Sequence, residues 1–116
     1  MLRPSVYTKD TMSPIQIGTL ADVPDNTGKR FVVEGEVIAV FRVGAELYAI
    51  DDTCSHADAS LCEGDFDPDE LCVECPLHGS TFDLRTGRPR SLPAFESVAT
   101  YKVWAEGATL FVDYPA

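Results

Sequence analysis

Short apolar runs separated by turn-forming residues make up the hydrophobic pattern of this chain. Val, Ile, Phe and Tyr recur within the runs, and Gly, Pro, Asp and Asn separate them, which is typical of β-strands joined by tight turns. No segment keeps a 3.6-residue period, and residues 21–24 allow at most one helical turn. The pattern therefore predicts an all-β sandwich or barrel, with strands at residues 15–20, 29–34, 36–43, 46–51, 71–74, 81–83, 98–104 and 109–113. Hairpin or other tight turns are expected at Gly35, Gly44-Ala45 and Glu106-Gly107.

Two short runs carry the chemistry: Cys54-Ser55-His56 and Cys75-Pro76-Leu77-His78. Each supplies one thiolate and one imidazole. Two Cys and two His paired in this way fit a [2Fe–2S] centre in which two His replace two Cys on one iron, which raises the reduction potential above that of an all-Cys cluster. The alternative is a Cys₂His₂ zinc site. Structural zinc usually pairs like ligand with like, whereas here each run mixes Cys with His, so the pattern favours the iron–sulfur centre.

The two motifs and their flanks resemble the Rieske ferredoxin family. The flanks are Tyr48-Ala49-Ile50-Asp51-Asp52 before the first motif, and Gly79-Ser80 followed by Thr81-Phe82-Asp83-Leu84-Arg85-Thr86-Gly87 after the second. The similarity runs from about residue 15 to residue 112 and points to the small ferredoxin components of aromatic-ring-hydroxylating dioxygenases, of the biphenyl and carbazole dioxygenase type. It implies a Rieske fold: an antiparallel β-sandwich base that carries a smaller cluster-binding subdomain.

The resemblance also implies the ligands of one [2Fe–2S] cluster. Cys54 and Cys75 would bind one iron, toward the core. His56 and His78 would bind the other iron, near the surface, where an imidazole edge offers a short path to a partner's cofactor.

Several neighbours of these ligands match family positions. Gly79 is expected to let the backbone approach the cluster, because glycine has no Cβ. Ser80 matches a serine that can donate its hydroxyl to a bridging sulfide. Pro93 resembles the proline of a loop that shields the cluster from water.

Two departures from the respiratory Rieske proteins imply a low potential. Phe82 stands where those proteins have a tyrosine that donates to a Cys sulfur, and phenylalanine cannot donate. Ala59 and Leu77 stand at the positions of their loop disulfide. Both changes favour a potential toward the end of the Rieske range at about −150 mV.

A chain of 116 residues is expected to form one domain. Residues 1–12 are predicted to be a loose arm, residues 13–116 a single Rieske domain, and residues 51–93 its cluster-binding subdomain. No Ser-His-Asp set, P-loop or dinucleotide motif is present, and both His are assigned to the cluster. We therefore expect an electron carrier and not an enzyme.

The formal charge of −10 and the pI near 4.4 disfavour nucleic acid and anionic membranes as partners. A basic docking face on a partner is favoured. The spacer between the two motifs has no Lys or Arg and seven acids, which makes it either a docking rim or a solvated loop: Asp58, Glu63, Asp65, Asp67, Asp69, Glu70 and Glu74. Arg85, Arg88 and Arg90 follow the second motif and are candidates to pair with these acids.

No apolar run reaches the roughly 20 residues that span a bilayer, and the first ten residues lack the apolar core of a signal peptide. We expect a cytoplasmic monomer. Cys62 and Cys72 are outside the ligand set, as buried thiols or as a disulfide under oxidation. Trp104 is expected to pack in the core.

The function implied by the resemblance is transfer of one electron from a flavin-containing reductase to the terminal oxygenase of an aromatic-ring dioxygenase system. Three alternatives stay open at this point: a Rieske carrier for another client, such as iron–sulfur assembly or another oxygenase; a nitrite-reductase small subunit; and a structural zinc module. The sequence does not identify the aromatic substrate or the class of reductase.

Overall fold

The computed structural model describes residues 12–55, 59–77, 79–91, 94 and 96–115. Within these residues there are strands and two short 3₁₀ turns but no α-helix. The elements are β1 (Met12–Thr19), η2 (Leu20–Asp22), β2 (Gly28–Val33), β3 (Glu36–Val43), β4 (Glu46–Asp51), η3 (Leu61–Glu63), β5 (Asp65–Asp67), β6 (Cys72–Glu74), β7 (Thr81–Asp83), β8 (Thr100–Tyr101), β9 (Val103–Glu106) and β10 (Thr109–Pro115).

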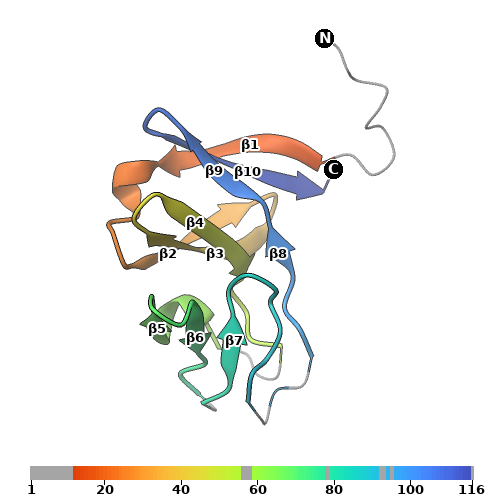
Figure 1. Ribbon diagram of the computed structural model, residues 1–116. Helices are drawn as coiled ribbons and strands as arrows, with labels where there is room; N and C mark the ends of the chain where they lie inside the picture. Colours follow the sequence, from red (N-terminus) through yellow and green to blue (C-terminus); the bar gives the residue numbers. More distant parts are fainter. Residues whose placement is uncertain (1–11, 56–58, 78, 92–93, 95, 116) are drawn as a thin grey trace.

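The strands form three antiparallel sheets with the orders β1-β10-β9, β2-β3-β4-β8 and β5-β6-β7. Figure 1 shows the first two sheets together as a base, and the third sheet below them beside the loops that contain the Cys-His motifs. The prediction of an all-β, antiparallel fold is confirmed.

Strand β3 is buried on both of its faces, because it lies between the other two sheets. Ile38 and Val40 point toward β1 and β10, where they pack with Val112 and Leu110 respectively. Ala39 and Phe41 point the other way, into the group of buried residues that includes Cys54 and Cys75. Its central residues therefore read as a continuous apolar run, as expected for a strand covered on both sides.

The chain between residues 98 and 104 does not form the single strand that the sequence predicted. It forms β8, which pairs with β4, and β9, which pairs with β10, so the chain changes sheets at Lys102. The carbonyl of Lys102 accepts a hydrogen bond of 2.9 Å from the backbone N–H of Asp113. Lys102, the charged residue of this stretch, stands between the two short strands.

One strand was not predicted from the sequence. Strand β5 lies inside the acidic spacer, where only Phe66 gives a strand signal between two Asp residues.

Trp104 is half-buried outside the core, where it stacks on Phe111 at 5.9 Å between ring centroids. The prediction that Trp104 packs in the core is wrong, because its indole N–H reaches the exposed Glu106 carboxylate.

The other predicted elements are observed with small shifts at their ends. The turns at Gly35, Gly44-Ala45 and Gly107 connect β2 to β3, β3 to β4 and β9 to β10. Residues 1–11 lie outside the described part of the chain, so the predicted arm and domain boundaries stay predictions, although β1 already begins at Met12. No helix in the described residues is long and apolar enough to span a bilayer.

Gly64 permits the close approach of β5 to β6. A Cβ at this position would overlap the backbone carbonyl of Glu74, the residue before Cys75. We expect Gly64→Ala to lower the free energy of unfolding by about 2–4 kcal/mol, since backbone cannot move aside cheaply. Gly107→Ala is the control: a Cβ there meets no atom within 4 Å, and only its φ of 63° is unfavourable, so a cost of about 1 kcal/mol is expected. Urea unfolding of both variants measures the difference, and equal costs would contradict the packing argument.

Candidate metal centre

The two predicted cysteine ligands lie in the same buried part of the molecule. Cys54 follows β4 and is 4% exposed, and Cys75 directly follows β6 and is 1% exposed. Both belong to one hydrophobic group that also contains Leu61, Phe82 and Ala94. The fold therefore brings together two thiols that are separated in sequence by the whole acidic spacer.

The first Cys-His motif lies on a loop that is closed at its base by Asp52. The Asp52 carboxylate is 3% exposed and accepts hydrogen bonds of 2.9 Å from the Ser60 hydroxyl and from the Cys62 backbone N–H. The Asp52 carbonyl accepts a third hydrogen bond, from Leu61 N–H at 2.6 Å, and Cys54 N–H donates to the Ala59 carbonyl at 3.0 Å. These bonds hold the two ends of the loop against one another.

The second motif is closed by backbone hydrogen bonds on both sides of Gly79. Cys75 N–H donates to the Ser80 carbonyl at 2.7 Å, and Gly79 N–H donates to the Cys75 carbonyl at 2.9 Å. Gly79 has a φ of +78°, which favours glycine. The described neighbours leave room for a Cβ, since the nearest atom, of the Glu74 carboxylate, would be 3.4 Å away. Among the described residues, the left-handed backbone conformation is therefore the feature that favours glycine at this position.

Ser80 and Phe82 are both completely buried beside this loop. The Ser80 hydroxyl oxygen accepts a hydrogen bond of 2.9 Å from the backbone N–H of Ala94. Phe82 packs in the hydrophobic group of the two cysteines. His56, His78 and Pro93 lie outside the described residues. Among the residues that are described, no group of three or more His, Cys, Asp and Glu side chains is arranged to hold a metal ion.

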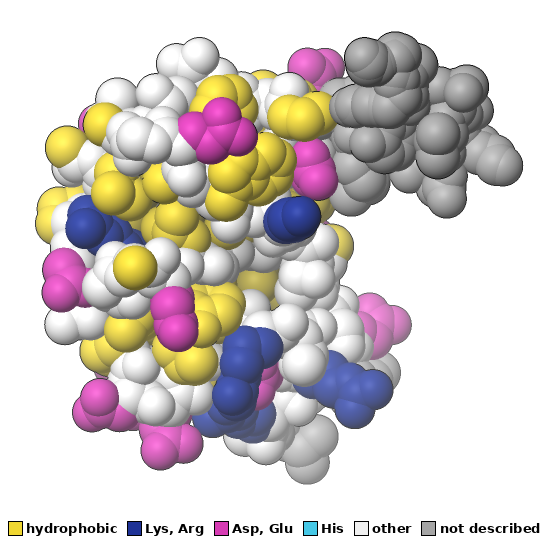
Figure 2. Space-filling model, turned by 45° about the horizontal axis from the view of Figure 1, so that its top comes forward, with side chains coloured by type: hydrophobic (Ala, Val, Ile, Leu, Met, Phe, Trp, Pro, Cys, Tyr) yellow, Lys and Arg dark blue, Asp and Glu magenta, His cyan; other side chains and the backbone are white. Residues whose placement is uncertain are grey.

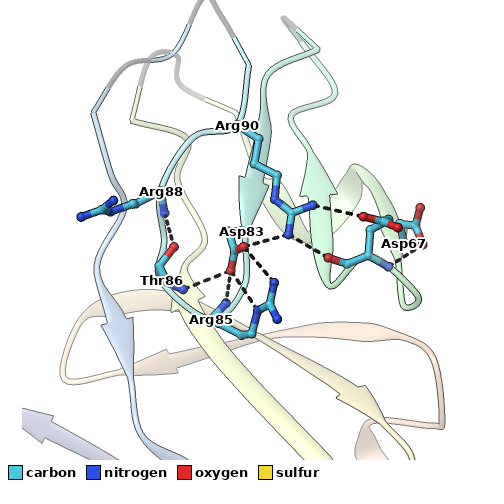
Figure 3. A network of polar contacts seen from close by, with 7 residues as sticks. Asp67, Asp83, Arg85, Thr86, Arg88 and Arg90 are labelled. Atoms are coloured by element: carbon cyan, nitrogen blue, oxygen red, sulfur yellow. Dashed lines mark hydrogen bonds and ion pairs between the residues drawn. The ribbon is translucent and has the colours of Figure 1, made fainter.

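Asp83, at the end of β7, is the centre of a polar network (Figure 3). Its carboxylate accepts hydrogen bonds from the backbone N–H of Arg85 at 2.7 Å, from Thr86 N–H at 3.3 Å and from the Arg90 guanidinium at 2.8 Å. Burial by itself would raise the pKa of Asp83, but the hydrogen bonds from Arg90 and Arg85 outweigh it and hold this pKa well below its usual range. Asp83 is therefore ionised in the folded protein at neutral pH.

Among the described residues, one of the three arginines pairs with the spacer as predicted. Arg90 does pair with an acid of the spacer, since its guanidinium lies 3.7 Å from the Glu70 carboxylate. Arg85 pairs instead with Asp83 at 3.3 Å, and Arg88 makes no ion pair with any described residue. The roles of Asp52 and Asp83 were not predicted, although both residues stand in the flanks that carried the family resemblance.

The donor set suits a [2Fe–2S] cluster. A buried pair of thiols in an apolar group can hold one iron as thiolates, and the motif supplies two imidazoles at the matching positions. Cys62 and Cys72 form no disulfide, and the structure places them outside the two ligand motifs.

Comparison with known proteins identifies the class. The family model of the Rieske [2Fe-2S] domain matches residues 13–102. The chain therefore belongs to the Rieske [2Fe–2S] domain family, with the cofactor that this domain carries.

The most similar relatives include the 3-phenylpropionate/cinnamic acid dioxygenase ferredoxin subunit of Escherichia coli (strain K12), which is 45% identical over 104 residues, covering 90% of this chain and 96% of the relative. Among solved structures, the ferredoxin of carbazole 1,9a-dioxygenase from Nocardioides aromaticivorans IC177 has a TM-score of 0.84 and 38% identity, with 88% of this chain and 98% of that chain covered. Such ferredoxin subunits are electron-transfer components of dioxygenase systems and not catalysts, so the prediction of an electron-carrier ferredoxin is confirmed.

The Cys62 thiol offers a test of the structure around the first loop. Burial, followed by the charge of Asp52, raises the pKa of Cys62 from its ordinary 9.0 to about 11. The folded protein should therefore hold on the order of a hundredfold less Cys62 thiolate at pH 8 than an unperturbed thiol. We expect the alkylation rate by iodoacetamide, followed by mass spectrometry, to keep rising between pH 8 and pH 10. A rate that levels off near pH 9, as in the urea-unfolded protein, would contradict the burial.

Proposed function

We propose that this protein is a monomeric cytoplasmic Rieske ferredoxin that takes one electron from a flavin-containing reductase and delivers it to the terminal oxygenase of an aromatic-ring dioxygenase. The observation that carries the proposal is the burial of Cys54 and Cys75 in one apolar group, each at the start of a motif that ends in His. The relatives support the choice of client, because they are ferredoxin subunits of such dioxygenases.

We assign Cys54 and Cys75 to one iron and His56 and His78 to the other. When bound, the cluster accepts and returns one electron at a potential that its ligands and hydrogen bonds determine. The buried cysteines exclude water from one side of the site. Ser80 has its hydroxyl oxygen engaged by the Ala94 N–H, so its own proton is free to be donated to sulfur. Phe82 has no proton to donate, which favours a low potential.

Electron paramagnetic resonance of the dithionite-reduced protein tests the assignment, with iron and sulfide counted on the same sample. We expect a rhombic signal with an average g value well below that of an all-Cys cluster, and two irons per chain, because imidazoles replace two thiolates on one iron. A protein that gives no signal, contains one zinc per chain and does not recover the signal after reconstitution with iron and sulfide would sink the proposal.

The partner surface is assigned to the exposed acids of the β5-β6 hairpin. A solved complex of oxygenase and ferredoxin in carbazole 1,9a-dioxygenase contains a ferredoxin that is 32% identical to this chain, with a TM-score of 0.79 and coverage of 89% of this chain and 95% of that one. In this protein Asp65, Asp69 and Glu74 are exposed and have no ion pair with any described residue. Figure 2 shows Asp and Glu side chains along the lower edge of the face in view, next to a group of Lys and Arg. Unpaired surface acids favour a partner with a basic docking face.

Charge reversal at Asp65 and Asp69 tests this surface. Asp67 is left in place because its carboxylate closes the turn, accepting hydrogen bonds from the N–H groups of Asp69 at 3.0 Å and Glu70 at 3.1 Å. We expect the double variant Asp65→Lys/Asp69→Lys to slow electron transfer to the oxygenase by about tenfold at low salt, and much less at high salt where charges are screened. Stopped-flow kinetics over a range of ionic strength measures the effect.

The matched control reverses two exposed acids on other hairpins, Glu46→Lys and Glu106→Lys. It changes the net charge by the same amount. Equal slowing by the two double variants would show that net charge alone acts, and would remove the assigned docking surface while leaving the electron-carrier role intact.

A further inference from the structure

Arg90 joins three segments that are far apart in the chain. One nitrogen of its guanidinium donates to the Asp83 carboxylate at 2.8 Å and to the backbone carbonyl of Glu70 at 2.9 Å. Another nitrogen lies 3.7 Å from the Glu70 carboxylate. The Arg90 guanidinium thus links the end of β7 to the turn between β5 and β6 (Figure 3).

The Arg90–Asp83 contact is a partly buried ion pair. The exposed fraction of the side chain is 31% for Arg90 and 14% for Asp83. Asp83 is ionised, as its lowered pKa indicates. The guanidinium uses one nitrogen for the Asp83 carboxylate and the Glu70 carbonyl and places its other nitrogen near the Glu70 carboxylate, whereas the shorter side chain of a lysine has a single nitrogen and cannot make both sets of contacts.

Arg90, Ser91 and Ala94 make hydrogen bonds with Ser80 and Thr81, the two residues that follow Gly79. Arg90 N–H donates to the Thr81 carbonyl at 2.6 Å, and Thr81 N–H donates in return to the Ser91 hydroxyl at 2.9 Å. Ala94 N–H then donates to the buried Ser80 hydroxyl oxygen. The backbone carbonyl of Ser80 accepts a hydrogen bond from the N–H of Cys75. Ser80 is therefore bonded through its carbonyl to a predicted iron ligand and through its hydroxyl to Ala94.

We propose that Arg90 is a positioning residue: its guanidinium keeps Arg90, Ser91 and Ala94 in their hydrogen bonds with Thr81 and Ser80, and thereby holds the Ser80 hydroxyl in the orientation that leaves its proton for the cluster. The inference rests on the proposed function, because the acceptor of that proton is a sulfur atom of the cluster. A hydroxyl that donates to sulfur stabilises the reduced state and raises the potential. If the Ala94–Ser80 hydrogen bond is weakened, the Ser80 hydroxyl can turn away from the sulfur atom, and the reduction potential falls.

A double-mutant cycle on the midpoint potential tests the proposal, measured by protein-film voltammetry on the cluster-loaded protein. Arg90→Lys keeps the charge but removes the second nitrogen and shortens the side chain, so that the contacts with Asp83 and Glu70 are not all kept. We expect it to lower the potential by part of the fall that Ser80→Ala produces, and to cause no further fall in the Ser80→Ala background. Arg88→Lys is the matched control, since Arg88 is exposed in the same loop and makes no ion pair with the described residues. This variant should leave the potential unchanged.

Hydrogen exchange of the Ala94 amide, followed by mass spectrometry, gives a second readout. We expect exchange about tenfold faster in Arg90→Lys than in Arg88→Lys, because the Ala94–Ser80 bond opens more often. If Arg90→Lys fails to load the cluster, Glu70→Ala replaces it in the same cycle, since it removes one carboxylate of the network and keeps the backbone carbonyl.

The proposal would be overturned if Arg90→Lys lowered the potential equally in the wild-type protein and in the Ser80→Ala variant. It would also be overturned if Arg90→Lys left both the potential and the exchange of the Ala94 amide unchanged. Either result would still come from a protein with a normal Rieske spectrum. Failure of the proposed function is distinguishable, because the wild-type protein itself would then lack that spectrum.

Discussion

The burial of β3 on both faces is the constraint on which the rest of the structure depends. Phe41 on one face packs against Phe66 of β5, with ring centroids 4.9 Å apart, and Ile38 and Val40 on the other face close the base. Each such side chain contributes about 1.5–3 kcal/mol when fully buried. Because one strand supports both layers, the sheet that carries the second ligand loop cannot move without disturbing the base. The second ligand loop is therefore mounted on a sheet that packs against the buried strand of the base.

Each ligand loop adds its own carboxylate to this support. Loops cannot satisfy their backbone N–H groups with a sheet ladder, so they need other acceptors when they are buried. Asp52 supplies one at the base of the first loop and Asp83 supplies one beyond the second. Hydrogen bonds to a charged acceptor are stronger than neutral ones. An electron carrier benefits from such rigid ligand loops, because a site that is already arranged for both oxidation states needs little reorganisation.

The fold class and the ligand motifs could be predicted from the sequence, whereas the contacts that hold them could not. Runs of apolar, often β-branched or aromatic, residues bounded by turn residues predict β2, β3, β4 and β10. Strand β5 was missed because Asp disfavours strands, and its pairing with β6 is a long-range effect that overrides local preference. The break at Lys102 was missed because one charged residue does not by itself mark the end of a strand; β3 continues through Arg42. Arg90 bonds residues 7 and 20 positions away, and no periodicity predicts such a pairing.

The acidic spacer shows how one stretch of sequence can serve two physical needs. Asp67 closes a turn, and Glu63 and Glu70 lie near Arg30 and Arg90, while the neighbouring Asp65 and Asp69 are exposed. Surface ion pairs add only about 0–1 kcal/mol to stability, so fold stability does not account for so many acids. Unpaired charges speed encounter with an oppositely charged surface and add little to the lifetime of a complex. Large apolar contacts would instead lengthen the lifetime of the complex, since they slow dissociation. Within the second motif, Leu77 is the large apolar side chain that is exposed among the described residues. A surface rich in unpaired charge and poor in apolar area suits a carrier that must leave its partner as soon as the electron has passed.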